Sequence, residues 1–362
     1  MHRAFELSRV FSSLRQAVIV IDEASYMIIF ANPAAKSALG FDPTGRAAKE
    51  LLPMDIFAED APNYLCGTNF MGRAASITVV KDLEKIMLFI DFIKVEKPSL
   101  NITRHMINSL RGSVMGIKMS ADRCFSMMED GKEPSEKYIS VLYHYYYSLL
   151  RTITQIDSAD LIERGELPFS PMPTNIVTLC SELTDTVSRL CNNSGAKINF
   201  TTEEPEFIAV VDSSKIEQLL LNLFANSLQH TTSGNSITLS LSRLGNRLII
   251  SMDDDGEGIP PEALSDIFSI PDDNNTLDLN PSGIGLGLYI SFGIVQLHKG
   301  VILIESHEGS GTRVRVMLPT DEDAAPKFNC PETSYRHEGI SSALTGLADV
   351  LTNSAFGLKY ED

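Results

Sequence analysis

The sequence of 362 residues has few basic residues, few cysteines and no long apolar run. It carries 30 lysines and arginines against 47 aspartates and glutamates, which gives a formal net charge of −17. A chain with this excess of acid does not attract nucleic acid or an anionic membrane through its overall electrostatic field. We therefore predict that nucleic acid is not among its partners.

The other absences concern the membrane and the redox state. The nearest approach to a membrane-spanning run, Ile86–Ile93, is interrupted by Asp91 and is far shorter than the roughly 18–20 residues that cross a bilayer. The first ten residues lack the apolar stretch of a secretion signal. The five cysteines are scattered and form no CxxC or CxH pair, so neither a zinc motif nor a disulfide framework is indicated. We expect a reduced, cytoplasmic protein with no membrane span.

What the sequence does contain is several stretches of regular hydrophobic pattern. Hydrophobic residues make up 43% of the chain, enough for a buried core in each of two or three domains. Two β-rich runs, residues 17–22 and 26–32, flank a short polar turn and predict a hairpin. Helical spacing over residues 99–130 and 137–164 predicts two long helices about a short turn. The apolar stripe of the first helix is Ile102, Met106, Leu110, Val114, Ile117 and Ala121.

A single pair of helices cannot bury such a stripe, so we expect two copies of the chain to pair in a four-helix bundle. Beyond it, helical and β-rich runs alternate in mixed order from Asn175 to Pro319, which predicts an α/β sandwich. The predicted fold class is α+β and multidomain. Its parts are a sensor-like α/β domain at 1–95, the helical hairpin at 96–168, the sandwich at 169–320, and an acidic, partly disordered tail at 321–362 with a helix over Ile340–Thr352.

Two patterns in the C-terminal half point to a ligand that carries a cation and an amine. Asn222 and Asn226 lie four residues apart on a predicted helix, so both amides face the same way, and amide oxygens bind hard cations such as Mg²⁺. Asp254 ends a predicted strand and can accept a hydrogen bond from an amine such as that of adenine. Gly256 and Gly258 after it let the backbone approach a ligand closely.

Two further patterns follow in the same order along the chain. Gly283, Gly285 and Gly287 lead directly into a predicted helix, and a glycine loop at a helix N-terminus presents free N–H groups to phosphates. Thr312 follows a glycine turn between two predicted strands, where it is placed for a backbone or phosphate contact. Each pattern alone also has a purely structural explanation, but all four in sequence favour a nucleotide site.

Together, the four patterns resemble the N box and the three glycine boxes of the sensor histidine kinases, and Phe268 resembles the phenylalanine box between them. The resemblance implies a GHKL-type domain that binds ATP and Mg²⁺, with Asn226 and Asn222 as metal ligands. The residues that it assigns to ATP are Asn222, Asn226, His230, Asp254, Gly256, Gly258, Ile259, Phe268, Gly283, Gly285, Leu286, Gly287, Leu288 and Thr312.

The resemblance extends towards the N-terminus. Residues 5–95 resemble a PAS sensor domain, and the helical hairpin resembles the dimerisation and phosphoacceptor domain of the same family. This implies a homodimer through the hairpin. It also implies phosphoryl transfer from ATP to a histidine and then to the receiver domain of a response regulator.

The acceptor position departs from the family pattern. In the register that keeps the apolar positions, Asn108 stands where the family has its phosphoacceptor histidine, and Ser109 where it has an acidic residue. An amide nitrogen is not basic and does not take a phosphoryl group. His105, one turn earlier, is the alternative acceptor, in a register that fits the bundle less well.

Three hypotheses therefore stay open at this point. The first is a histidine kinase that uses His105. The second is a kinase-like ATP-binding scaffold or regulator that does not autophosphorylate. The third is an ATPase or serine-type kinase of the same superfamily, which the intact hairpin disfavours.

Overall fold

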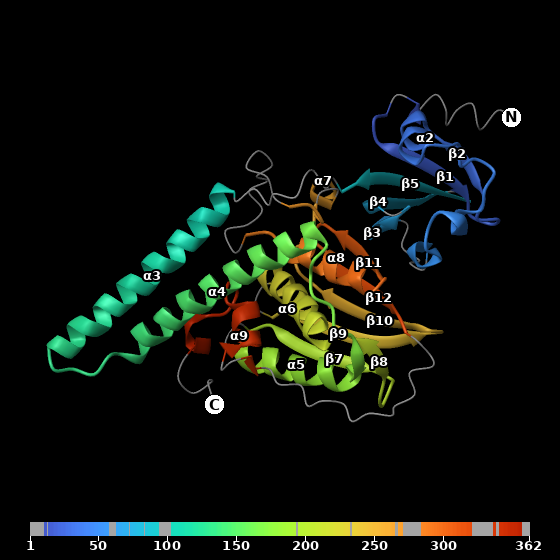
Figure 1. Ribbon diagram of the computed structural model, residues 1–362. Helices are drawn as coiled ribbons and strands as arrows, with labels where there is room; N and C mark the ends of the chain where they lie inside the picture. The colour runs from blue at the N-terminus through green and yellow to red at the C-terminus, as the bar shows by residue number, and fades with distance from the viewer. Residues whose placement is uncertain are drawn as a thin grey trace.

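The structure is a computed structural model. It describes residues 11–12, 14–57, 63–71, 73–82, 84–93, 103–192, 195–231, 234–264, 267–270, 284–320, 336–337 and 340–356. These residues form a sensor-like domain, a long helical hairpin and an α/β sandwich, followed by a short C-terminal segment (Figure 1). The domain boundaries expected from the sequence remain predictions.

The N-terminal domain is an antiparallel sheet with the strand order β2-β1-β5-β4-β3. The expected hairpin is present as β1 and β2, with Ile19 opposite Ala31. Asn32 follows β2 and holds the next helix, because its side chain accepts hydrogen bonds from the backbone N–H groups of Ala35 (2.8 Å) and Val18 (2.9 Å). The elements are β1 (Ala17–Asp22), β2 (Ile28–Ala31), α2 (Pro33–Leu39), η1 (Ala48–Glu50), η2 (Met54–Phe57), β3 (Asn63–Phe70), β4 (Arg73–Asp82) and β5 (Lys85–Phe92).

The predicted hairpin consists of α3 (Arg104–Glu129) and α4 (Glu136–Arg164). Thr103 caps the start of α3 by accepting a hydrogen bond from the N–H of Met106 at 3.3 Å. Gly165 ends α4 with a φ of 68°, a left-handed conformation that favours glycine.

The two helices pack through small residues of α3. The side of α3 that is buried against α4 carries Ser113, Gly116 and Ser120, and an ideal Cβ on Gly116 would lie 2.3 Å from the ring of Tyr145. The predicted core residue Val114 is 53% exposed. Small residues let the two backbones approach and accommodate the tyrosines of α4. Within one chain, Met106 of the apolar stripe is fully buried while Val114 is exposed.

The C-terminal half is the expected α/β sandwich. Its sheet has the order β11-β12-β10-β9-β7, antiparallel except for the parallel pair β7 and β9. Helices α5, α6 and α8 cover one face of this sheet (Figure 1). The elements are β6 (Met172–Asn175), α5 (Ile176–Leu190), β7 (Lys197–Thr202), β8 (Ile208–Val211), α6 (Ser213–His230), β9 (Ser236–Leu244), β10 (Arg247–Asp254), α7 (Pro261–Leu264), α8 (Gly287–Leu297), β11 (Val301–His307) and β12 (Gly311–Pro319).

The sensor sheet and the sandwich sheet are joined edge to edge, which no sequence pattern indicated. Strand β3 pairs antiparallel with β11, with Gly67 opposite Ile302, and the two sheets form one of ten strands. An ideal Cβ on Gly67 would lie 2.9 Å from side-chain atoms of Ile302 and Phe292 and 3.0 Å from Phe268. The absence of a side chain at Gly67 therefore lets the two domains meet.

We expect Gly67→Ala to destabilise this junction by about 1–3 kcal/mol, because the added methyl group overpacks three side chains. Gly112→Ala is the matched control: Gly112 lies inside α3 with open space around its Cβ direction. Alanine there should stabilise the helix by about 0.5–1 kcal/mol. Urea unfolding followed by circular dichroism measures both changes. Equal stability of the two variants would contradict the packing at the junction.

The C-terminal segment contains β14 (Ile340–Ser341), α9 (Ser342–Leu347) and η3 (Asn353–Phe356), with β13 (Arg336–His337) before it. The helix α9 is shorter than the helix expected over Ile340–Thr352. It ends at Leu347, where the chain turns and Asp349 forms an ion pair with Arg151 of α4. The predicted disorder after Pro319 falls on residues outside the described part of the chain. Among the described residues, no helix is both long and apolar enough to cross a membrane.

Candidate functional site

A row of buried polar side chains lies along α6, next to the start of α8. Asn222 and Asn226 are on this row as expected, and Asn222 is only 5% exposed. An ideal Cβ on Gly287 would lie 3.8 Å and 3.7 Å from their Oδ1 atoms, so both amides face the first residue of α8. Gln229 continues the row at helical spacing, and Thr231 follows the last residue of α6. We call these four residues the α6 shelf.

Each residue of the α6 shelf has a buried polar atom with no hydrogen-bond partner in the described part of the protein. The atoms are Nδ2 of Asn222, Nδ2 of Asn226, Nε2 of Gln229 and Oγ1 of Thr231. Buried polar groups are nearly always hydrogen-bonded, and each that is not costs about 1–3 kcal/mol. Four such groups on α6 and directly after its end fit a polar ligand. The sequence reasoning missed Gln229 and Thr231, although Gln229 continues the helical spacing of the two asparagines.

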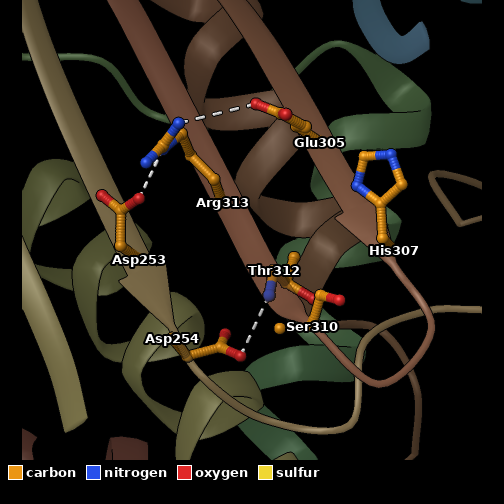
Figure 2. Close-up of a pocket in the computed structure, with 8 residues that line it drawn as sticks. Asp253, Asp254, Glu305, His307, Ser310, Thr312 and Arg313 are labelled. Atoms are coloured by element: carbon orange, nitrogen blue, oxygen red, sulfur yellow. Dashed lines mark hydrogen bonds and ion pairs between the residues drawn. The ribbon is translucent and has the colours of Figure 1, made fainter. Parts of the chain in front are cut away.

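Asp254 ends β10 and is fixed by three hydrogen bonds, of which Figure 2 shows the one to Thr312. Its carboxylate accepts from the hydroxyl of Ser227 at 2.9 Å, from the N–H of Gly256 at 3.1 Å and from the N–H of Thr312 at 3.2 Å. Burial raises the pKa of Asp254 above its usual value, and these hydrogen bonds act in the opposite direction. The side chain is thus a rigid, half-buried acceptor. Ser227 was not predicted from the sequence.

Gly256 and Gly258 allow the loop after Asp254 to lie against other backbone. An ideal Cβ on Gly256 would lie 2.5 Å from the carbonyl oxygen of His230, and one on Gly258 would lie 2.2 Å from that of His307. Gly258 also has a φ of 72°. No larger residue fits at either position without moving the backbone. The loop is thereby held beside the end of α6.

Three more residues of the predicted ATP set, Ile259, Thr312 and His230, make hydrogen bonds in or beside this loop. Ile259 donates its N–H to the hydroxyl of Ser306 at 2.8 Å, and Thr312 shares a hydrogen bond of 2.9 Å with the same hydroxyl. His230, at the end of α6, contacts Glu257 through Nδ1 at 2.6 Å. Asp254, Thr312 and the end of α6 are therefore brought together.

The glycine loop before α8 is described only in part. Gly285 has a φ of 73° and is exposed, while Leu286 is fully buried and precedes the first residue of α8, Gly287. Leu288 is half-buried. Gly283 lies outside the described residues. The N-terminus of α8, whose N–H groups can bind phosphate, thus faces the α6 shelf.

Phe268 does not point to the α6 shelf but into the junction of the two sheets. It is 1% exposed, its ring packs on Phe292 at a centroid distance of 5.3 Å, and it lies next to Gly67 of the sensor-like domain. The phenylalanine box is therefore a packing element here, and it contacts the sensor-like domain.

A shallow pocket of about 170 Å³ lies where β10 ends beside the β11–β12 turn (Figure 2). Arg313 forms ion pairs there with Asp253 and, at 3.6 Å, with Glu305. Of the residues that line the pocket, Asp254 and Thr312 belong to the predicted ATP set. The strand alternation places Asp253 and Asp254 on opposite faces of the sheet.

The two acceptor candidates lie at the start of α3. His105 is in the first turn and Asn108 in the second, and both are exposed. Ser109 faces α4, with its hydroxyl 3.3 Å from that of Thr152. Because both side chains are exposed, their accessibility does not distinguish the two candidates.

With this geometry established, family models match two parts of the chain. Residues 211–322 match the histidine kinase-, DNA gyrase B- and HSP90-like ATPase family, and residues 6–72 match the PAS domain family. The chain is similar to the sensor histidine kinases. Its C-terminal sandwich is a GHKL-type ATP-binding domain, and its N-terminal domain is a PAS domain.

Individual relatives agree with this assignment. Sporulation kinase A of Bacillus subtilis is 23% identical over 260 residues, covering 70% of this chain and 40% of that protein. The sensor protein EvgS of Escherichia coli is 26% identical over 269 residues, covering 73% of this chain and 22% of that protein. The chain thus spans less than half the length of these curated relatives.

Among solved structures, the histidine kinase ThkA in complex with the response regulator protein TrrA is 19% identical. The match covers 87% of this chain and 99% of that chain, with a TM-score of 0.45.

Proposed function

We propose that this protein is a histidine kinase of a two-component system, which transfers the γ-phosphoryl group of ATP to its own histidine and then to a response-regulator receiver domain. The observation that carries the proposal is the α6 shelf, a row of unpartnered buried polar atoms facing the first turn of α8. The phosphate oxygens of a nucleotide supply the acceptors that the amide nitrogens lack, and the Oδ1 atoms of the two asparagines are then available to a cation. Since ATP is the substrate, we further propose that the protein works in the cytoplasm.

Each part of the site has a role in this proposal. Asp254 accepts a hydrogen bond from the adenine amino group, and the rigid hydrogen bonds to Ser227 and Thr312 keep it in place. The N-terminus of α8 binds the phosphates through backbone N–H groups. Asn226 and Asn222 would hold Mg²⁺, whose chemical contribution is to neutralise charge on the phosphates.

His105 is the proposed acceptor. A ring nitrogen attacks the γ-phosphorus, a P–N bond forms, the P–O bond to the β-phosphate breaks, and ADP leaves with the bridging oxygen. Because His105 lies in the first turn of α3, the negative charge of the phosphohistidine would be stabilised by the positive end of the helix dipole. Asn108 has no basic nitrogen and cannot replace it.

The test is incubation of the whole protein with Mg²⁺ and ATP labelled at the γ-phosphate, in parallel with calorimetry of ATP binding. A kinase gives a protein-bound label that is stable to base, labile to acid, and transferable to a receiver domain. ATP binding without any label would contradict the proposal and support the ATP-binding scaffold instead.

We also propose that the protein is a homodimer through the hairpin. Every third or fourth residue of α3 from Ile107 to Met128 is apolar, and Ile107, Val114 and Met128 are between 42% and 57% exposed. Such a heptad seam is typical of helices that pack on another chain. The residues of the seam are Ile107, Leu110, Val114, Ile117, Ala121, Cys124 and Met128.

Two substitutions on α3 test this interface. Val114→Lys places a charge in the seam and is expected to shift the protein to a monomer in light scattering. Met119→Lys is the control, because Met119 is 68% exposed and, at about 100° per residue, lies on the side of α3 away from the seam. A dimer that survives Val114→Lys, or is lost in both variants, would contradict a dimer through this seam.

A further inference from the structure

The C-terminal segment, residues 341–356, lies between the helical hairpin and the ATP-binding domain. It follows the part of the chain that matches the ATPase family, which ends at residue 322. Figure 1 shows α9 between α4 and α5, beside α6. Its apolar side chains are buried in the core that both parts share, namely Ala343, Leu344, Leu347, Leu351, Ala355 and Phe356. We call this segment the strap.

On one side the strap contacts α4 through a charged and aromatic patch. Asp349 lies 3.0 Å from Nε of Arg151 and accepts a hydrogen bond from the hydroxyl of Ser148 at 3.0 Å. The side chains of this ion pair are only 9% and 13% exposed. The ring of Phe356 packs on His144 and Tyr147 at centroid distances of 5.2 Å and 5.8 Å. The strap therefore holds α4 over about two helical turns, from residue 144 to residue 151.

On the other side the strap contacts the ATP-binding domain through close apolar packing. An ideal Cβ on Gly346 would lie 2.8 Å from the side chain of Leu221, on the same helix as the α6 shelf. Ser342 also donates a hydrogen bond to Glu217 of α6. Helix α9 packs on α5 as well. This side fits without leaving polar atoms unpaired among the residues described.

The two sides differ in how well their polar atoms are satisfied. At α4, Nη1 of Arg151 and Nδ1 of His144 are buried and have no hydrogen-bond partner within the described chain. A buried ion pair with unsatisfied donors holds two elements together less strongly than apolar packing of the same extent. When the strap opens, α4 is therefore the side that separates.

We propose that the strap fastens the ATP-binding domain to α4 and that its release from α4, while it stays on α6, frees that domain to move. Besides the strap, α4 holds the domain through the hydrogen bond of 3.1 Å from Gln218 to Ser158 and through Ile162, which packs on Gly293 of α8. Phosphoryl transfer needs the γ-phosphate within about 3–3.5 Å of the acceptor nitrogen. A domain fastened along α4 cannot search for that geometry, so the strap acts as a brake. This last consequence rests on the proposed kinase activity.

Spin-label distances in the whole protein test the fastening without any use of phosphorylation. One label pair joins α4 to the ATP-binding domain, through cysteines at the exposed positions Thr154 and Asp185. A second pair joins the strap to that domain, through Asn353 and Asp185.

The native cysteines must not take up the label, so Cys124 and Cys330 are replaced by serine. Burial raises the pKa of the thiols of Cys180 and Cys191 to about 12, so these two remain unlabelled, as does the fully buried Cys66. Labelled chains are diluted in unlabelled protein.

Asp349→Ala and Phe356→Ala each remove one part of the contact with α4. We expect the wild type to show one narrow distance for the first pair. Either variant should raise the population of longer distances about tenfold, while the second pair stays unchanged. Asp122→Ala, which removes the acid of an exposed ion pair with Lys118 on α3, is the control and should match the wild type. Circular dichroism and ATP binding confirm that each variant is folded.

Unchanged distances for the first pair in both variants would overturn the proposal. So would equal broadening of both pairs, which indicates that the strap unfolds as a whole. In the kinase assay, release should raise the rate of label incorporation about tenfold, and a lower rate with longer distances would overturn the role as a brake. If no form of the protein incorporates label, the proposed activity fails while the distances still decide the fastening.

Discussion

Asp254→Asn is expected to lower ATP affinity by about 100-fold, which corresponds to the upper part of the roughly 1–3 kcal/mol lost when a buried polar group has no partner. Asparagine keeps an oxygen that can accept from the N–H groups of Gly256 and Thr312. Its amide nitrogen then stands where the second carboxylate oxygen was, next to Ser227. A donor would face the adenine amino group, which is itself a donor. Calorimetry with ATP measures the loss.

The same substitution should leave the fold at least as stable as the wild type. Burial raises the pKa of Asp254 above its value in the unfolded chain, so the stability that this group contributes is present at low pH and is lost as pH rises through the folded-state pKa. At neutral pH the ionised carboxylate therefore costs stability, and a neutral amide removes that cost. Urea unfolding at pH 7 with no nucleotide checks this.

Asp253→Asn is the matched control for Asp254→Asn. Asp253 is the preceding residue of β10 and faces the opposite side of the sheet, where it forms an ion pair with Arg313 (Figure 2). Its loss should leave ATP affinity within about twofold, as for other surface ion pairs. Similar affinity losses in both variants would show that the negative charge of the region, and not the acceptor at Asp254, determines binding.

His105→Ala is expected to remove the acid-labile label entirely while ATP affinity stays the same. The imidazole is the nucleophile in the proposed transfer, and alanine has no group that can form the P–N bond. His105 belongs to α3 and is neither part of the α6 shelf nor a hydrogen-bond partner of Asp254, so we expect nucleotide binding not to depend on it. Filter-bound counts after γ-labelled ATP, with calorimetry on the same samples, separate the two quantities.

Asn108→Ala is the control for His105→Ala, since Asn108 is exposed one turn further along the same helix face. It should retain the label, because its amide takes no part in transfer. Label that persists in His105→Ala would show that another residue accepts the phosphoryl group. Loss of label in both variants, with dimer and ATP binding intact, would indicate that this turn of α3 docks the ATP-binding domain and is not itself the acceptor.

The nucleotide site could be predicted from the sequence because its parts are local. The spacing of Asn222 and Asn226 on one helix face, and the glycines after Asp254, follow from backbone geometry over a few residues. The ATP-binding and PAS domains were identified because such local motifs resemble those of a known family, and the family comparisons confirm both. Ser227, Gln229 and Thr231 were missed, because a single serine or glutamine on a helix has no distinctive pattern until its neighbours in space are known.

The sequence by itself thus determined the elements, the order of the domains and the ATP-binding motifs, since all of these depend on residues that lie close together along the chain. Only the tertiary structure decided which faces meet. In it, Val114 is exposed on α3, β3 pairs with β11 at Gly67, and Asp349 forms an ion pair with Arg151, some 200 residues earlier in the chain. Such contacts depend on the shapes of surfaces distant in sequence, and hydrophobic periodicity identifies an apolar face without identifying its partner.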